Sequence, residues 1–295
     1  MPHLDLELKT KMSSFRRIAI GTWRTTYDPS IYGSMTVRVD KLLRYMDEFR
    51  EKTGRKVTIT HMMAKAVAET LKEMPDANAL LRFNRIYVRK DIGVFFQVAM
   101  TDDETGEIDL SGATIHQADQ KSLVQIYDEF VAQVKKVRSK KDPELEGTRS
   151  TFKKIPFFLL NFFMDMLSFL LFTLNLDLKR FGVPRDPFGS AMVTNIGSLG
   201  LEEAYVPLVP YSKVPILIAT GAIEDVPVVR DGELTVAKKM KLCATMDHRI
   251  VDGSHAAVMS RVLRAWIEDP YGHFDDLSGL DEASPEQPAE GAAPD

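Results

Sequence analysis

Stretches with the two-residue period of β-strands alternate with stretches of helical spacing along most of the 295-residue chain. Residues 34–43 alternate apolar and polar side chains and then pass into a helical segment that ends near Gly54. Residues 119–138 carry apolar side chains at helical spacing, and Asp231-Gly232 between two apolar runs predicts a tight hairpin. Because strands and helices interleave in this way, we expect a single α/β domain with a mixed sheet and helices in two layers.

The other expected elements follow from the same patterns. We expect strands within residues 86–100, 190–196, 214–221 and 226–246, a helix over 60–74 with Thr60 as its N-cap, and a helix over 254–268.

Charge and cysteine content narrow the class of protein. The formal net charge of −4 gives no general attraction to nucleic acid or to an anionic membrane. The one cysteine, Cys243, excludes an internal disulfide and a cysteine-based zinc site, and its apolar surroundings predict an inert core residue. His248 and His255 lack the spacing of metal ligands, so we expect no metal. Residues 1–12 contain no apolar run of signal-peptide length, so we expect a cytoplasmic protein.

The motif His-x-x-x-Asp-Gly, from His248 to Gly253, carries the strongest chemical signal. The apolar run Met240–Met246 has the character of a strand and delivers His248 to a turn that Gly253 closes. An ordinary imidazole, with a pKa of about 6.5, can accept the proton of a thiol with a pKa of about 8.5. The motif therefore indicates a general base acting on a thiol or a hydroxyl, with a histidine hydrogen-bonded in a loop as the alternative.

Further stretches stand in a fixed order with this motif. They are Ser13–Ala19, Thr60–Ala68, Met74–Asn78, Arg89–Val94, Ala118–Leu123, Thr194–Gly197, Val214–Ala222 and Asp247–Gly253. Together, over about residues 12–270, they resemble the acyltransferase catalytic domain of 2-oxoacid dehydrogenase complexes and its relative chloramphenicol acetyltransferase.

The resemblance implies a chloramphenicol acetyltransferase-like fold, a homotrimer with active sites between subunits, and coenzyme A as a substrate. It implies that His248 deprotonates the thiol and that Thr194, where the family has a serine, donates to the oxyanion. Asp252, the third catalytic candidate, corresponds to one partner of a supporting ion pair with Arg16, and Gly253 supports the same turn. The residues that bind coenzyme A stay unassigned.

The resemblance also predicts the boundaries of the domains. We expect an N-terminal arm over residues 1–12, a catalytic domain over 13–280 with an apolar helical insertion at about 150–186, and a disordered acidic tail over 281–295. No lipoyl attachment segment precedes the catalytic domain, so a lipoylated carrier protein would act in trans. Residues 109–117 lack the proline that the family has there, which leaves the acceptor open.

The segment 155–178 is strongly apolar and has basic residues on both sides. Its length would suit a membrane span, but the motifs before and after it belong to one catalytic fold. Asn161, Asp165, Ser168 and Asn175 would form a polar stripe on one helix. We therefore expect a buried helix or helical hairpin, packed on the body or between subunits; a membrane-surface helix, or a lid over a long acyl chain, stays open but is not favoured.

These observations predict a coenzyme A-dependent acyltransferase, with a dihydrolipoyl group as the acceptor that the resemblance implies. Two alternatives remain. One is a non-catalytic trimeric scaffold, and the other is an acyltransferase for a small hydroxyl or amine compound or for a lipid.

Overall fold

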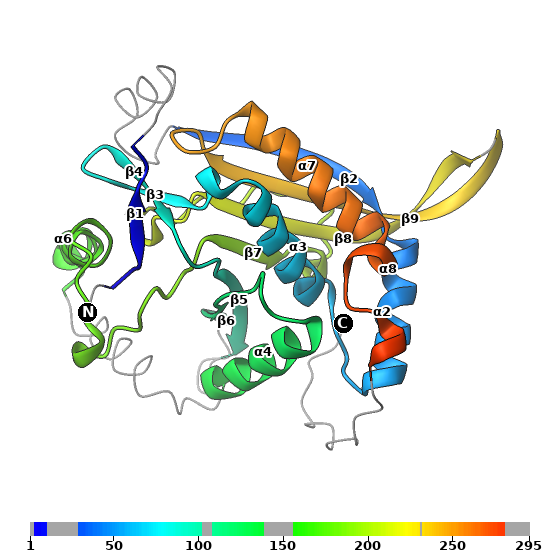
Figure 1. The fold of residues 1–295 in the computed structure, drawn as a ribbon, viewed down its shortest axis with the longest axis horizontal. Helices are drawn as coiled ribbons and strands as arrows, with labels where there is room; N and C mark the ends of the chain where they lie inside the picture. Colours follow the sequence, from blue (N-terminus) through cyan, green and yellow to red (C-terminus); the bar gives the residue numbers. More distant parts are fainter. Residues whose placement is uncertain (1–2, 11–28, 102–107, 139–155, 231, 281–295) are drawn as a thin grey trace.

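The computed structural model describes residues 3–10, 29–101, 108–138, 156–230 and 232–280, which form two sheets and a layer of helices (Figure 1). The smaller sheet is antiparallel, with the order β1-β4-β3. The larger sheet has the order β2-β9-β8-β7-β5-β6 and is mixed, because β7 runs parallel to both β5 and β8 while the other neighbours are antiparallel. The expected α/β fold with a mixed sheet is confirmed.

The elements have the following bounds. The strands are β1 (Leu6–Leu8), β2 (Ser30–Arg38), β3 (Ala79–Arg82), β4 (Arg85–Arg89), β5 (Val94–Thr101), β6 (Ile108–Ile115), β7 (Ala191–Asn195), β8 (Ile216–Arg230) and β9 (Glu233–Asp247). The helices are α2 (Asp40–Thr53), α3 (Ile59–Glu73), α4 (Leu123–Arg138), α6 (Phe157–Ser168), α7 (Gly253–Glu268) and α8 (Pro270–His273).

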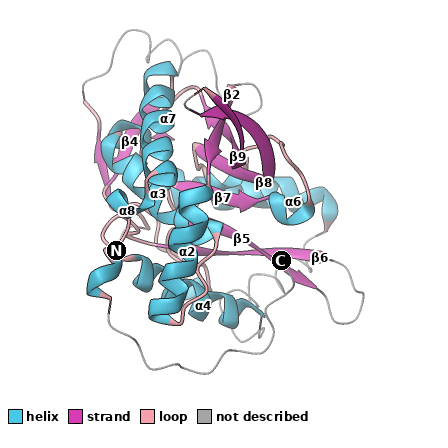
Figure 2. Cartoon of the chain, turned by 90° about the vertical axis from the view of Figure 1, so that its right-hand side faces the viewer, coloured by secondary structure: helices cyan, strands magenta, loops and turns pink. Residues whose placement is uncertain are grey.

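The main core lies between the larger sheet and the helix layer, which Figure 2 shows from the side. Helix α3 is buried on most of its faces because it packs against α4 and α7 as well as against β5 and β7. Its N-cap is Thr58, not the predicted Thr60. The Thr58 backbone N–H donates to Nδ1 of His61 at 3.0 Å, and this reciprocal cap starts the helix two residues earlier.

Strands β8 and β9 form one long hairpin of 15 residues each. Arg230 pairs with Glu233 across the predicted turn, in which Gly232 has a φ of 85° and Asp231 lies outside the described residues. The end of this hairpin projects from the body, as Figure 1 shows at the right. Cys243 is buried in β9.

The apolar segment forms α6 and a π-helical turn, Phe169–Thr173, so a helix is present as predicted. The prediction that it is buried was wrong, because one apolar face is exposed, with Phe162 at 68%. Leu167, Leu171 and Phe172 pack with Leu4 of the N-terminal arm in a second, smaller core. The expected polar stripe was wrong. Asn161 and Asp165 are exposed, but Ser168 is buried and donates to the Tyr211 carbonyl at 3.1 Å.

Asn175, the fourth residue of the expected stripe, lies beyond the helix with a φ of 57°. Its side-chain amide donates to the Leu4 carbonyl at 2.7 Å and ties the arm to the insertion. Near the end of the insertion, Asp186 accepts from Arg89 of β4 at 2.6 Å, and both side chains are buried.

No helix among the described residues combines the length and the apolar character needed to cross a membrane.

Candidate active site

His248 follows directly after β9, and hydrogen bonds to a neighbouring segment fix its backbone. Residues 239–247 of β9 pair with β2, and the His248 N–H then donates to the Pro29 carbonyl at 2.7 Å. The His248 side chain is half-buried, and its Nδ1 lies 3.0 Å from the Val251 carbonyl oxygen. Because a carbonyl can only accept, Nδ1 must carry the proton. The neutral ring then holds its lone pair on Nε2, which is the atom a general base needs.

A buried ion pair lies next to His248 in the chain. Arg249 Nη2 is 2.5 Å from one oxygen of Asp247, and Arg249 Nε is 2.9 Å from the other. The Asp247 N–H donates to the Pro215 carbonyl at 2.8 Å and so holds this turn against the start of β8. The pair has the two-bond geometry of strong arginine–carboxylate contacts, and we assign it a structural part.

Asp252 caps helix α7. Its carboxylate accepts from the Ser254 N–H at 3.1 Å, from the Ser254 hydroxyl at 2.6 Å and from the His255 N–H at 3.3 Å. Burial raises the pKa of Asp252, but the hydrogen bonds from Ser254 and His255 outweigh it and hold this pKa well below its usual range. Asp252 therefore stays ionised and fixes the turn between His248 and α7.

Gly253 and Arg16 are the two residues predicted to support the active site. Gly253 is the first residue of α7, and a Cβ built on it would meet no atom within 4 Å, so packing among the described residues does not require glycine there. Arg16, the predicted ion-pair partner of Asp252, lies outside the described residues.

Thr194 lies near the carboxyl end of β7, half-buried. Its hydroxyl donates to the side-chain oxygen of Gln97 on β5 at 3.2 Å. The turn that follows lies close to β8. A Cβ added to Gly197 would lie only 2.5 Å from the Gly221 carbonyl oxygen. The glycine of the Thr-Asn-Ile-Gly motif thus lets the turn approach the sheet.

Within one chain the structure does not bring Thr194 and His248 together. Thr194 is level with Ala219 of β8, and Ala219 is level with Cys243 of β9. His248 comes five residues after Cys243, beyond the opposite end of the sheet. Strand geometry places the two residues about 15–20 Å apart, since each residue step is ~3.3 Å and each strand spacing is ~4.8 Å.

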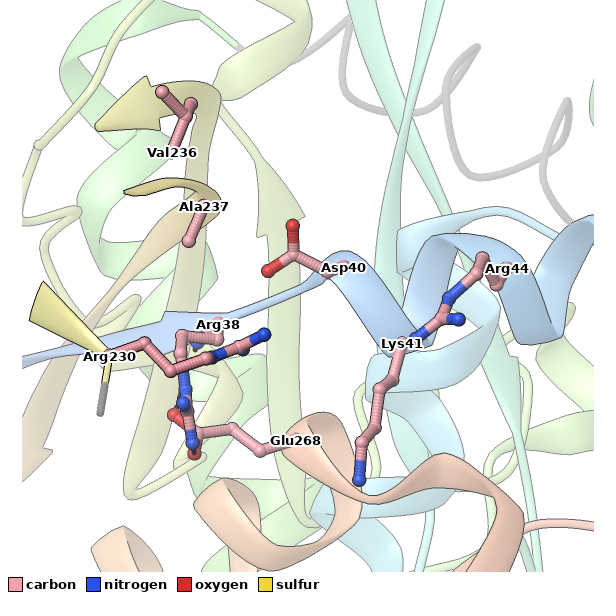
Figure 3. A pocket seen from close by; sticks show the side chains of 8 residues that line it. All are labelled: Arg38, Asp40, Lys41, Arg44, Arg230, Val236, Ala237 and Glu268. Atoms are coloured by element: carbon pink, nitrogen blue, oxygen red, sulfur yellow. Dashed lines mark hydrogen bonds and ion pairs between the residues drawn. The ribbon is translucent and has the colours of Figure 1, made fainter. Parts of the chain in front are cut away.

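A basic hollow, which sequence reasoning missed, lies at the far end of β2 from His248. It has a volume of about 440 Å³ and is lined by Arg38, Asp40, Lys41, Arg44, Arg230, Val236, Ala237 and Glu268. Figure 3 shows Arg38 beside Arg230 and Glu268, and Arg38 is 3.2 Å from the Glu268 carboxylate. The lining residues come from four separate segments, so no local motif announces them.

Metal ligands do not gather among the described residues: no three His, Cys, Asp or Glu side chains there could hold one ion.

Comparison with known proteins identifies the family. The model of the 2-oxoacid dehydrogenases acyltransferase (catalytic domain) family matches residues 9–153 and 188–274 and leaves out the insertion between them. The lipoamide acyltransferase component of the branched-chain alpha-keto acid dehydrogenase complex of Bacillus subtilis is 25% identical over 229 residues, which are 76% of this chain and 43% of that protein. The acetyltransferase component of the pyruvate dehydrogenase complex of Rhizobium meliloti is 25% identical over 254 residues, 83% of this chain and 46% of that protein. The chain thus spans about half the length of these relatives.

Solved structures share the fold. A probable dihydrolipoamide acetyltransferase from Listeria monocytogenes superposes with a TM-score of 0.61 at 19% identity, over 93% of this chain and 98% of that one. Dihydrolipoamide acetyltransferase from Azotobacter vinelandii, studied for the role of a serine, a histidine and an asparagine in its mechanism, gives 0.60 at 21% identity, over 90% of this chain and 93% of that one. From the family match, which includes His248 and Thr194, we conclude that this chain belongs to the 2-oxoacid dehydrogenases acyltransferase (catalytic domain) family.

Proposed function

We propose that the chain is a coenzyme A-dependent acyltransferase in which His248 is the general base and Thr194 the oxyanion donor. The observation that carries the proposal is the contact between His248 Nδ1 and the Val251 carbonyl, since it sets the tautomer that leaves Nε2 able to take a proton. The family match and the hydroxyl at Thr194 support the same reaction.

In the proposed reaction, Nε2 of His248 takes the proton of the acceptor thiol as the sulfur attacks the acyl carbonyl of acyl-coenzyme A. A new C–S bond forms, and the carbonyl oxygen becomes an oxyanion to which the Thr194 hydroxyl donates. The intermediate collapses by breaking the bond to the sulfur of coenzyme A, which leaves as its thiol with the proton from His248. One positioned oxyanion donor contributes on the order of 10²–10³ in rate.

The same proposal requires more than one copy of the chain. Thr194 and His248 lie too far apart within one chain to act on one carbonyl, so a complete site takes His248 from one copy and Thr194 from another. This supports the homotrimer with sites between subunits. An active site shared by two copies in a ring is a heterologous contact that repeats and closes.

The proposed acceptor is a dihydrolipoyl group on a lipoylated carrier. Relatives of this chain are named as the dihydrolipoyllysine-residue acetyltransferase components of a pyruvate dehydrogenase complex and of an acetoin cleaving system. The chain spans only about half the length of those proteins. The acceptor and the carrier are therefore proposed from membership of the family.

The test is acyl exchange between a series of acyl-coenzyme A thioesters, from short to long, and free dihydrolipoamide. We expect turnover by the wild-type protein, a loss of at least about 10²-fold in His248→Ala, consistent with the loss of a general base, and normal gel filtration of both proteins. His273→Ala is the matched control, since His273 is exposed in α8 and has no step in the reaction.

Equal turnover by wild type and His248→Ala would refute the assigned base. If neither turns over while calorimetry detects coenzyme A binding, the acceptor is another hydroxyl, amine or lipid compound. If coenzyme A does not bind and large assemblies form, the scaffold function replaces this proposal.

A further inference from the structure

Helix α6 presents an apolar stripe to solvent. Leu159, Phe162, Met166 and Phe169 follow one another at steps of three, four and three residues, so they share one face of the helix and its π-helical continuation. Their exposed fractions are 43%, 68%, 40% and 46%. Such a run of large apolar side chains on one exposed face is unusual for a solvated surface and marks an interaction site.

The opposite side of the helix is already occupied. Leu167 and Leu171 pack into the small core with Leu4, and Ser168 is bonded to the Tyr211 carbonyl. The stripe is therefore not an unfilled part of the protein core. Its edge is polar, because the exposed side chains of Asn161 and Asp165 follow it on one flank.

Positive charge lies at the end of the stripe. The chain leaves α6 through Leu174 and Leu176, which are 40% and 42% exposed, and reaches the exposed Lys179 and Arg180. Three residues of chain span at most ~10 Å, so Lys179 stays close to Leu176. Apolar and aromatic side chains on one helix face with basic residues beside them are the pattern of helices that lie in a membrane interface.

We propose that α6 docks this protein on the surface of a bilayer that contains anionic phospholipid. The stripe enters the boundary between headgroups and acyl chains, and Lys179 and Arg180 contact the headgroup phosphates. A second copy of the chain is a poorer occupant. The family model leaves out residues 154–187, so contacts between copies that the family shares do not need this helix. The proposal is independent of acyl transfer, because vesicle binding is measured without substrates.

The test is flotation of the full chain with vesicles of phosphatidylcholine alone or mixed with phosphatidylglycerol. We expect wild type to float with the mixed vesicles and to bind less as salt is raised. Phe162→Ser with Phe169→Ser should lower the bound fraction about tenfold or more, since two large side chains no longer enter the interface. Lys179→Glu with Arg180→Glu should abolish the preference for phosphatidylglycerol. Val229→Ser with Leu234→Ser is the matched control, because both side chains are even more exposed, at 74% and 77%, on the distant β8–β9 hairpin; it should bind as wild type does.

A second measurement keeps the test independent of vesicle aggregation or of a variant that folds poorly. In Phe162→Trp, docking should shift the indole emission to shorter wavelength when mixed vesicles are added, and brominated lipid should quench it. Three results would overturn the proposal: no flotation of wild type, equal flotation of the Phe162/Phe169 variant, or an indole that ignores lipid. Light scattering without lipid tests the other occupant. A wild-type mass that falls in the Phe162/Phe169 variant would assign the stripe to a contact between copies instead.

Discussion

The imidazole of His248 is oriented by the carbonyl of Val251, three residues further along the same turn, at 3.0 Å from Nδ1. In serine-protease triads the corresponding partner of the histidine is a carboxylate. Here the nearest carboxylate in sequence, Asp247, is bonded to Arg249 instead. The turn itself therefore performs the orienting, and the supporting charges around it act on stability.

Breaking the buried pair should cost stability. Asp247→Leu or Arg249→Met leaves one buried charge without its partner, and we expect a loss of about 3–5 kcal/mol in the free energy of unfolding. The double variant Asp247→Leu with Arg249→Met should recover part of that loss, because no charge then stays buried. Urea denaturation of the four proteins gives the coupling energy. If the stability losses of the two single variants add up to the loss of the double variant, the two residues do not interact.

Asp252→Ala should lower stability by about 1 kcal/mol, because α7 loses its N-cap. We expect turnover to fall far less than in His248→Ala, since Asp252 acts through the turn. Its depressed pKa makes the cap's contribution fully present above the ordinary carboxylate range and lost as the pH falls toward the folded value. Denaturation midpoints near neutral pH and in acid, compared with the uncharged cap of Asp252→Asn, test this sign.

His61 should make the protein sensitive to mild acid. Burial lowers the pKa of His61 to about 4, whereas the unfolded chain binds the proton near 6.5. As the pH falls from about 6.5 to 4, the unfolded state gains a proton first, which lowers the free energy of unfolding by about 3 kcal/mol in total. His61→Phe should show a shallower decline. Burial also lowers the pKa of His3 to about 4, so part of the decline in stability with falling pH should remain in that variant.

Two inactive variants should restore activity when mixed. Thr194→Ala and His248→Ala each lack one half of the proposed site. If chains exchange freely, about a quarter of the sites in mixed trimers pair an intact Thr194 with an intact His248, so we expect about a quarter of wild-type turnover. Co-refolding of the two proteins and an acyl exchange assay measure this. Activity no higher than that of the parents would place both residues in one chain's site or remove Thr194 from the mechanism.

The fold and the local structure of the His248 turn could be predicted because their signals are local. The hairpin at Gly232, the strand before His248 and the cap of α7 each depend on a few consecutive residues. The start of α3 was misplaced by two residues, since two threonines could cap it and only the packed position of His61 selects Thr58.

The distance between Thr194 and His248 could not be predicted from either motif. It depends on the register of three strands that are far apart in the sequence. The same holds for the basic hollow, whose arginines come from β2, α2 and β8, and for the exposed face of α6. Helical periodicity placed Asn161 and Ser168 on one stripe, but only the neighbouring Tyr211 decides that Ser168 is buried.

The buried contact between Arg89 and Asp186 limits how the insertion can be moved between proteins. Arg89 belongs to a strand within the residues shared with the family, while Asp186 belongs to the segment that the family model leaves out. Grafting that segment onto a relative without an arginine at the matching position would bury a carboxylate with no counter-charge. The insertion and the strand that carries Arg89 therefore have to be transferred together. A chimera that receives the insertion alone should fail to fold.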